Sequence, residues 1–226
     1  MRRRAVVVVL AFALVLAVTS YVAATRALGA GADKCERFSA DSVSRAAQVT
    51  GSGRRVVVLG DSWSAGLGLD QPQRSWPARL SGRVHVAGFS GSGFSALASP
   101  CGRVSFADRA GAVVEGADLV VVEGGLNDWD RPDSEIRAGF TRLVRVLRAA
   151  GVQRVVVVGP ASAPSRAAKV PHVDALLAGL SAQYGVGYVS TADLDLDYLD
   201  DRLHLTYAGH REFGDAVRTR LAGLPS

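Results

Sequence analysis

Short apolar runs rich in valine recur along the chain from about residue 54, and they alternate with longer stretches of helical spacing. Continuous runs of this kind are typical of strands that are buried on both faces of a parallel sheet. The pattern predicts five strands, at Arg55–Leu59, Val84–Ala87, Leu119–Glu123, Arg154–Val158 and Val186–Val189.

Three stretches of the chain carry apolar residues at helical spacing. The first helix is expected to begin near Asp130–Pro132, where proline and acids suit a first turn, and to end at Gly151. The second ends at Gly185, and the third begins near Thr206. Alternating strands and helices predict an α/β domain over residues 54–226, with helices on both faces of a parallel sheet.

The N-terminus has a different pattern. Arg2–Arg4 precede residues 5–24, an apolar run without a charge. This order is typical of a signal peptide, and a run of about 20 residues is also long enough to cross a bilayer. Residues 1–32 are therefore expected to be either a signal peptide or an N-terminal membrane anchor, with the body exported in both cases. Residues 33–53 are expected to form a linker with room for a short helix.

The composition agrees with one globular domain that follows an N-terminal targeting segment. The 226 residues are 48% hydrophobic and 21% charged, which excludes disorder as the main state. A formal charge of +5 and a pI of about 9.7 suggest nucleic-acid binding at first sight. Without residues 1–32, however, 22 basic and 21 acidic residues remain. The body is nearly neutral, so no nucleic-acid partner is expected.

The two cysteines, Cys35 and Cys101, are far apart in the sequence. An exported domain meets an oxidising compartment, in which a disulfide between them would form readily. A loop of this length would add roughly 4 kcal/mol of stability. Two free thiols are the alternative. A metal site is not expected, because no further Cys or His has suitable spacing.

Four polar or glycine-rich segments follow predicted strands. They are Gly60–Ser64, Gly88–Gly93, Gly124–Asp128 and Asp201–His204. The carboxyl ends of parallel strands share one edge of a sheet, and ligand sites of open α/β sheets lie outside that edge. The sequence therefore predicts that the four segments converge on one site.

These segments contain the residue types that nucleophilic catalysis needs. A serine nucleophile requires a base to take its proton, and the base requires a group that holds its tautomer. Ser62 is the candidate nucleophile, His204 the base and Asp201 its partner. The candidate donors to a developing oxyanion are the backbone N–H groups of Ser62 and Gly91 and the side-chain amide of Asn127.

Other polar and aromatic residues receive simpler interpretations. Trp63 and Trp129 adjoin the motif residues, and lining a substrate site and plain packing are equally weighted alternatives for them. Asp61 and Asp128 are expected to hold loops. Strand, surface or structural positions are expected for the remaining histidines, His85, His172 and His210.

The four segments resemble the sequence blocks of the SGNH hydrolases, also called the GDSL esterases and lipases. The matching residues come in the family's order: Gly60–Ser62, Gly91, Gly125–Asp128 and Asp201–His204. The resemblance covers about residues 54–222. One departure is Val86, where family members often carry a non-catalytic asparagine.

The resemblance implies a flavodoxin-like three-layer α/β/α sandwich, in agreement with the strand pattern. It implies Ser62 as nucleophile, His204 as base and Asp201 as its partner, with Gly91 and Asn127 completing the oxyanion hole. The implied activity is hydrolysis of a small-molecule or envelope ester through an acyl-enzyme, with no metal or organic cofactor. The loops are short, which favours short-chain acyl or acetyl esters of lipid or carbohydrate. A monomer is expected.

Two other functions stay open. A transacylase would use the same residues with an alcohol acceptor in place of water. A non-catalytic binding domain would keep the fold without the reaction, but it would not need Ser62, Asp201 and His204 together. A dinucleotide site in Gly88–Gly93 is disfavoured, because the glycine order is wrong and the loop follows the second strand.

Overall fold

The structure is a computed structural model, and it describes residues 16, 18–20 and 31–224. Five parallel strands pair side by side in the order β2-β1-β3-β4-β5. Their bounds are β1 Arg55–Gly60, β2 Arg83–Gly88, β3 Leu119–Glu123, β4 Val155–Val158 and β5 Gly187–Val189. Each end lies within one residue of its predicted position. This strand order is the flavodoxin-like one, in which the chain reverses direction across the sheet next to β1.

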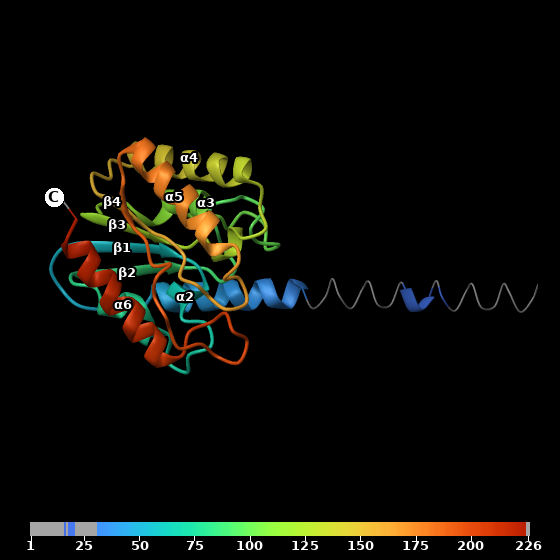
Figure 1. Cartoon of the computed structure of the whole chain (residues 1–226). Coiled ribbons are helices and arrows are strands. Elements are labelled where there is room, and N and C mark those ends of the chain that lie inside the picture. The colour runs from blue at the N-terminus through green and yellow to red at the C-terminus, as the bar shows by residue number, and fades with distance from the viewer. Residues whose placement is uncertain (1–15, 17, 21–30, 225–226) are drawn as a thin grey trace, which may run out of the picture. The chain divides into compact units, whose positions relative to one another are not determined.

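Helices cover both faces of this sheet, as Figure 1 shows. The helices are α2 Ser62–Ala65, α3 Phe106–Val113, α4 Asp133–Ala149, α5 Val170–Tyr184 and α6 Tyr207–Ala222. One core cluster joins Val57 and Leu59 of β1 to the apolar sides of α3, α4 and α5. The other joins Val56 and Val58 of the same strand to Phe213 of α6. Alternate residues of one strand thus serve opposite cores, which confirms the three-layer α/β/α sandwich.

A capping residue defines one end of α5 and one end of α6. The hydroxyl of Thr206 accepts a hydrogen bond from Gly209 N (3.1 Å) and caps α6. Gly185 ends α5 in the left-handed conformation, with φ of +64°. The sequence pattern gives no bounds for α3, because this helix has only 8 residues, FADRAGAV, and a glycine lies among them.

The N-terminal expectations meet the structure only in part. The expected signal peptide or anchor, residues 1–32, lies outside the described residues except for 16, 18–20 and 31–32. Within the described ranges no helix is both long and apolar enough to cross a membrane. Residues 31–46 are helical, so helix makes up most of the segment that the sequence assigns to a linker. Cys35 and Cys101 are both disulfide-bonded, which confirms the expected disulfide.

Candidate active site

The four segments that follow the strands meet at the carboxyl edge of the sheet. β1 lies between β2 and β3, and Gly60 pairs with Gly88 where β1 and β2 end. A hydrogen bond from Ser62 to His204 joins the first segment to the last. The side chain of Asn127 donates to both the first and the second segment. The convergence expected from the strand pattern is therefore present.

Ser62 is the first residue of α2, a single helical turn directly behind β1. Oδ1 of Asp61 accepts a hydrogen bond from the backbone N–H two residues further on (2.9 Å), and this bond starts the turn. Gly66, with φ of +80°, ends it by donating to the Ser62 carbonyl. A Cβ at Gly60 would lie 2.0 Å from Ser64 Oγ, so glycine is needed where the strand enters the turn. The turn places Ser62 at the sheet edge, with 6% of its surface exposed.

Ser62, His204 and Asp201 form one chain of hydrogen bonds. Nε2 of His204 lies 3.1 Å from Oγ of Ser62, and Nδ1 lies 2.5 Å from Oδ2 of Asp201. Oδ1 of Asp201 accepts from the backbone N–H groups of Leu203 and His204, each at 2.9 Å. Arg202 takes φ of +57°, and the tight loop that results lets Asp201 reach the ring three residues later.

The surroundings of Asp201 favour its ionised form. Partial burial raises the pKa of this carboxyl, but the hydrogen bonds from the His204 ring and from two backbone N–H groups outweigh burial and leave the pKa lowered. An ionised carboxylate on Nδ1 holds the ring with Nε2 free to accept a proton from Ser62. The geometry is therefore suited to activating a serine hydroxyl.

Trp63 lies in the core and not at the site surface. It is 2% exposed, and its ring packs edge-on against Phe213 at 5.1 Å. Its Nε1 donates to the carbonyl of Leu203 (3.1 Å) and so fastens the histidine loop to α2. Of the two alternatives for this residue, packing is the one that the structure shows. Trp129 is 39% exposed and stays a candidate for contact with substrate.

Three groups are the candidate donors to an oxyanion: the backbone N–H groups of Ser62 and Gly91 and the side-chain amide of Asn127. Gly91 takes φ of +84°, a conformation that favours glycine, and within the described residues no backbone or side-chain acceptor of its N–H is found. Asn127 Nδ2 donates to the carbonyl of Ser92 (2.9 Å) and, more weakly, to Oδ2 of Asp61 (3.2 Å). The Ser62 N–H is the first of its helix and has no helical partner.

Three carboxyls are buried beneath this edge. Burial raises the pKa of Asp61 to about 6 and that of Asp128 to about 7. Burial and the neighbouring charge of Asp61 raise the pKa of Glu123 well above its usual range. Asp128 accepts from the backbone N–H groups of Phe94 and Ser95, at 3.0 and 2.7 Å. Asp128 therefore holds the second loop, as expected from the sequence.

Comparison with protein families decides the identification. Residues 58–212 match the GDSL-like lipase/acylhydrolase family. The chain belongs to this family. It is a carboxylic ester hydrolase, and the resemblance read from the four sequence blocks is confirmed.

Solved structures share the fold of this hydrolase. Est24, a carbohydrate acetylesterase from Sinorhizobium meliloti, is 20% identical with a TM-score of 0.65, and the match covers 76% of this chain and all (100%) of that one. The aryl esterase of M. smegmatis is 20% identical with a TM-score of 0.62, over 76% of this chain and 100% of its own. The sequence matches no curated protein.

Two residues that support the site of the hydrolase were not found from the sequence. Arg109 of α3 is a half-buried cation that donates to Gly60 O (2.9 Å) and to Ser92 Oγ (2.8 Å), and so joins the first two site segments. Glu123 accepts from Ser64 Oγ at 2.6 Å, directly behind α2. A single arginine on a helix and a strand-ending glutamate carry no motif, so only the three-dimensional structure shows them.

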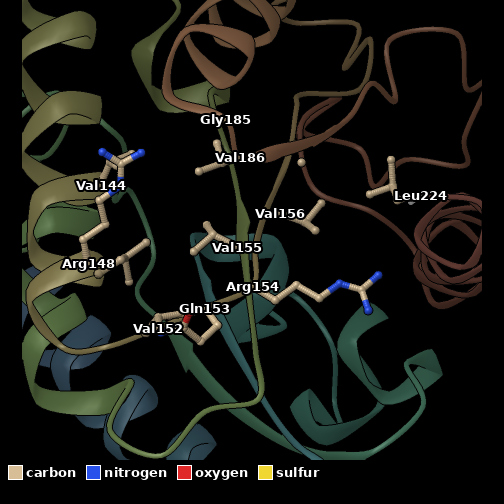
Figure 2. Close-up of a pocket in the computed structure, with 12 residues that line it drawn as sticks. Val144, Arg148, Val152, Gln153, Arg154, Val155, Val156, Gly185, Val186 and Leu224 are labelled. Carbon is tan, nitrogen blue, oxygen red and sulfur yellow. The ribbon is translucent and has the colours of Figure 1, made fainter. Parts of the chain in front are cut away.

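Other features of the hydrolase lie away from the triad. His210 is 1% exposed, and burial lowers its pKa to about 3, so it is a neutral structural residue. No cluster of three or more His, Cys, Asp or Glu side chains in the described part of the chain could hold a metal ion. A cavity of about 660 Å³ lies at the amino ends of β4 and β5. Figure 2 shows Arg148 and Arg154 among the apolar side chains that line it. None of its lining residues belongs to the four site segments.

Proposed function

We propose that the hydrolase is an exported serine esterase that cleaves short-chain acyl or acetyl esters of lipid or carbohydrate. The observation that carries this proposal is the hydrogen-bonded chain Asp201–His204–Ser62, with distances of 2.5 and 3.1 Å. The chain ends at a hydroxyl that is presented on a sharp turn behind a buried strand.

The proposed reaction has two acyl-transfer steps. His204 Nε2 takes the proton of Ser62 Oγ as the oxygen attacks the ester carbonyl carbon. The tetrahedral intermediate collapses, the bond to the alcohol breaks, and His204 returns the proton to the leaving alkoxide. A water then gives a proton to His204 and attacks the acyl carbon; the bond from that carbon to Ser62 Oγ breaks, His204 returns the proton to Oγ, and the acid is released. Asp201 stays ionised and stabilises the imidazolium in both steps.

Charge on the carbonyl oxygen needs donors during both steps. In the proposal these are the N–H groups of Ser62 and Gly91 and the Asn127 amide. The longer of the two Nδ2 contacts of Asn127, 3.2 Å to Asp61, is the one that an oxyanion would share or replace. Replacement of Asn127 by alanine is expected to lower kcat on the order of 100-fold. A loss below about threefold would remove Asn127 from the oxyanion hole.

Two observations support a small acyl group. Ser62 is only 6% exposed, so the carbonyl that it attacks must enter a narrow space. Est24, which has the same fold, is described as a carbohydrate acetylesterase. A series of p-nitrophenyl esters of increasing chain length tests this part of the proposal. The highest kcat/KM is expected for the shortest acyl chains, and a maximum at long chains would contradict it.

Export is proposed from the sequence of residues 1–32. Three arginines before an apolar run form an address that keeps the N-terminus inside while the body crosses the membrane. Fractionation of cells that express the full chain would find activity outside the cytoplasm. Activity confined to the cytoplasm would contradict export and leave the esterase proposal standing.

The nucleophile is tested by Ser62→Ala, with Ser134→Ala as the matched control. Ser134 is an exposed serine of α4. The first variant is expected to lose ester hydrolysis while its thermal unfolding stays that of the wild type, and the control is expected to keep full activity. If Ser62→Ala keeps most of the activity, the proposed mechanism is wrong.

A further inference from the structure

Arg166 lies in the connection between β4 and α5, next to the third site segment, and no motif includes it. Its Nη1 donates to the backbone carbonyl of Leu126 and to Oδ1 of Asn127, the latter at 2.9 Å. Both acceptors belong to the short 3₁₀ turn Leu126–Asp128. One guanidinium thus holds the backbone and the side chain of the segment that carries the candidate oxyanion amide.

The amide of Asn127 is held at both of its ends. Nδ2 donates to the carbonyl of Ser92 and to the carboxyl of Asp61, while Oδ1 accepts from Arg166. A guanidinium has only donors, and a backbone carbonyl has only acceptor sites. If the amide turned by half a rotation, Nδ2 would face the N–H groups of Arg166 and Oδ1 would face the carbonyl of Ser92. Only one of the two orientations satisfies every partner.

We propose that Arg166 is a positioning residue that keeps the N–H end of the Asn127 amide directed toward the oxyanion. The catalytic consequence rests on the proposed esterase function. A cation on Oδ1 also polarises the amide and makes its N–H groups stronger donors. Arg166 therefore acts on the reaction through Asn127 and does not need to touch the substrate.

Backbone hydrogen bonds hold the connection that carries Arg166. The backbone N–H of Arg166 donates to Ala163 O (2.8 Å), and the backbone N–H of the preceding residue, Ser165, donates to Arg202 O (3.0 Å). Arg202 lies between Asp201 and His204 in the sequence, so the arginine is anchored to the histidine loop. The guanidinium also lies 5.9 Å from the ring centre of Trp129. A direct contact with substrate is the competing role for this arginine, and it would alter KM rather than kcat.

A double-mutant cycle separates the two roles. Arg166→Met is expected to lower kcat roughly 10- to 100-fold with little change in KM, because a charge-assisted hydrogen bond to the amide is lost. In an Asn127→Ala background the same change is expected to add less than about twofold, because the amide through which it acts is gone. Arg166→Lys keeps the charge and is expected to recover part of kcat.

Arg220→Met is the matched control for the loss of a half-buried arginine. Arg220 likewise donates to a backbone carbonyl, that of Ser190, and it pairs with Asp193 at 2.8 Å, away from the oxyanion segment. It is expected to leave kcat and KM unchanged. An equal loss of kcat with Arg166→Met in the wild-type and Asn127→Ala backgrounds would overturn the proposal, and so would an effect on KM alone.

A second measurement needs no catalysis. Asn127 is the only asparagine in the sequence, so selective ¹⁵N labelling of asparagine side chains gives one pair of NH₂ signals. Both protons are expected to be resolved and slow to exchange with solvent in the wild type and in Arg220→Met. In Arg166→Met they are expected to shift and to exchange faster. Unchanged signals in Arg166→Met would overturn the positioning role, whether or not the protein hydrolyses esters. Inactivity of the wild type on every ester would instead contradict the proposed function.

Discussion

Replacement of Asp201 by asparagine is expected to lower kcat about 10⁴-fold without unfolding the protein. The two oxygens of this carboxylate have different partners. Oδ1 accepts from the backbone N–H groups of Leu203 and His204, both at 2.9 Å, and Oδ2 accepts from the His204 ring at 2.5 Å. Asparagine has the shape of aspartate, but an NH₂ group, which donates hydrogen bonds, replaces one of the two accepting oxygens.

The orientation of the new amide follows from these contacts. Oδ1 must stay with the two backbone donors, because turning the amide would bring its NH₂ group against both. The NH₂ group then faces His204 Nδ1 and donates to it. The ring must carry its proton on Nε2, opposite Ser62, and cannot accept the serine proton. A 10⁴-fold loss corresponds to about 5.5 kcal/mol of transition-state stabilisation.

Initial rates of p-nitrophenyl acetate hydrolysis would measure this loss, and thermal unfolding would confirm that the fold is kept. Asp200→Asn is the matched control, because Asp200 is the adjacent exposed acid and lies outside the hydrogen-bonded chain. The control is expected to keep kcat within about twofold, as is usual for a surface change. If Asp201→Asn keeps more than about a tenth of wild-type kcat, Asp201 does not set the tautomer of the base.

Four substitutions are also expected to change stability. The pKa of Glu123 is raised in the folded protein, so the stability of the wild type falls as pH rises above the pKa of this group in the unfolded chain. The free energy of unfolding of Glu123→Gln in urea, minus that of the wild type, should therefore grow with pH by at most about 1.4 kcal/mol per pH unit. A difference that does not change with pH would contradict the raised pKa. Gly139→Ala should lower Tm, because its Cβ would lie 1.9 Å from Phe94 O, whereas Gly179→Ala has open space and should stabilise α5 by roughly 0.5–1 kcal/mol. Phe213→Ala should cost about 3–5 kcal/mol, because the ring is fully buried.

Much of the fold could be predicted from the sequence because its strands are unusually explicit. A continuous valine run, which is typical of a strand buried on both faces, shows no helical spacing of apolar residues that would favour a helix instead. The predicted strand Leu119–Glu123 agrees with the structure at both ends. α4 was also found, since Ile136, Phe140 and Leu147 form a clear buried stripe. The bounds of α3 do not follow from the sequence, because the helix has only 8 residues and its start depends on the Ser105 side chain, which accepts a hydrogen bond from Asp108 N.

Some residues of the site could be predicted from the sequence and others could not. Ser62, Asp201 and His204 follow from local motifs, and the carboxyl edge of the sheet brings them together. Residues that contact the site from parts of the chain outside the four segments belong to no recognisable motif. Arg109 and Arg166 reach the site from a helix and a connecting loop, and their partners are mostly backbone carbonyls, which are the same for every residue type.

The central claim is that Ser62 is the nucleophile of an ester hydrolase. Covalent labelling with a fluorophosphonate, read by intact and peptide mass spectrometry, tests it most directly, because this reagent is attacked by an activated serine. One adduct is expected, on the peptide that contains Ser62, with labelling absent in Ser62→Ala and much slower in His204→Ala. An adduct on another residue, or labelling of Ser62→Ala at the wild-type rate, would contradict the claim.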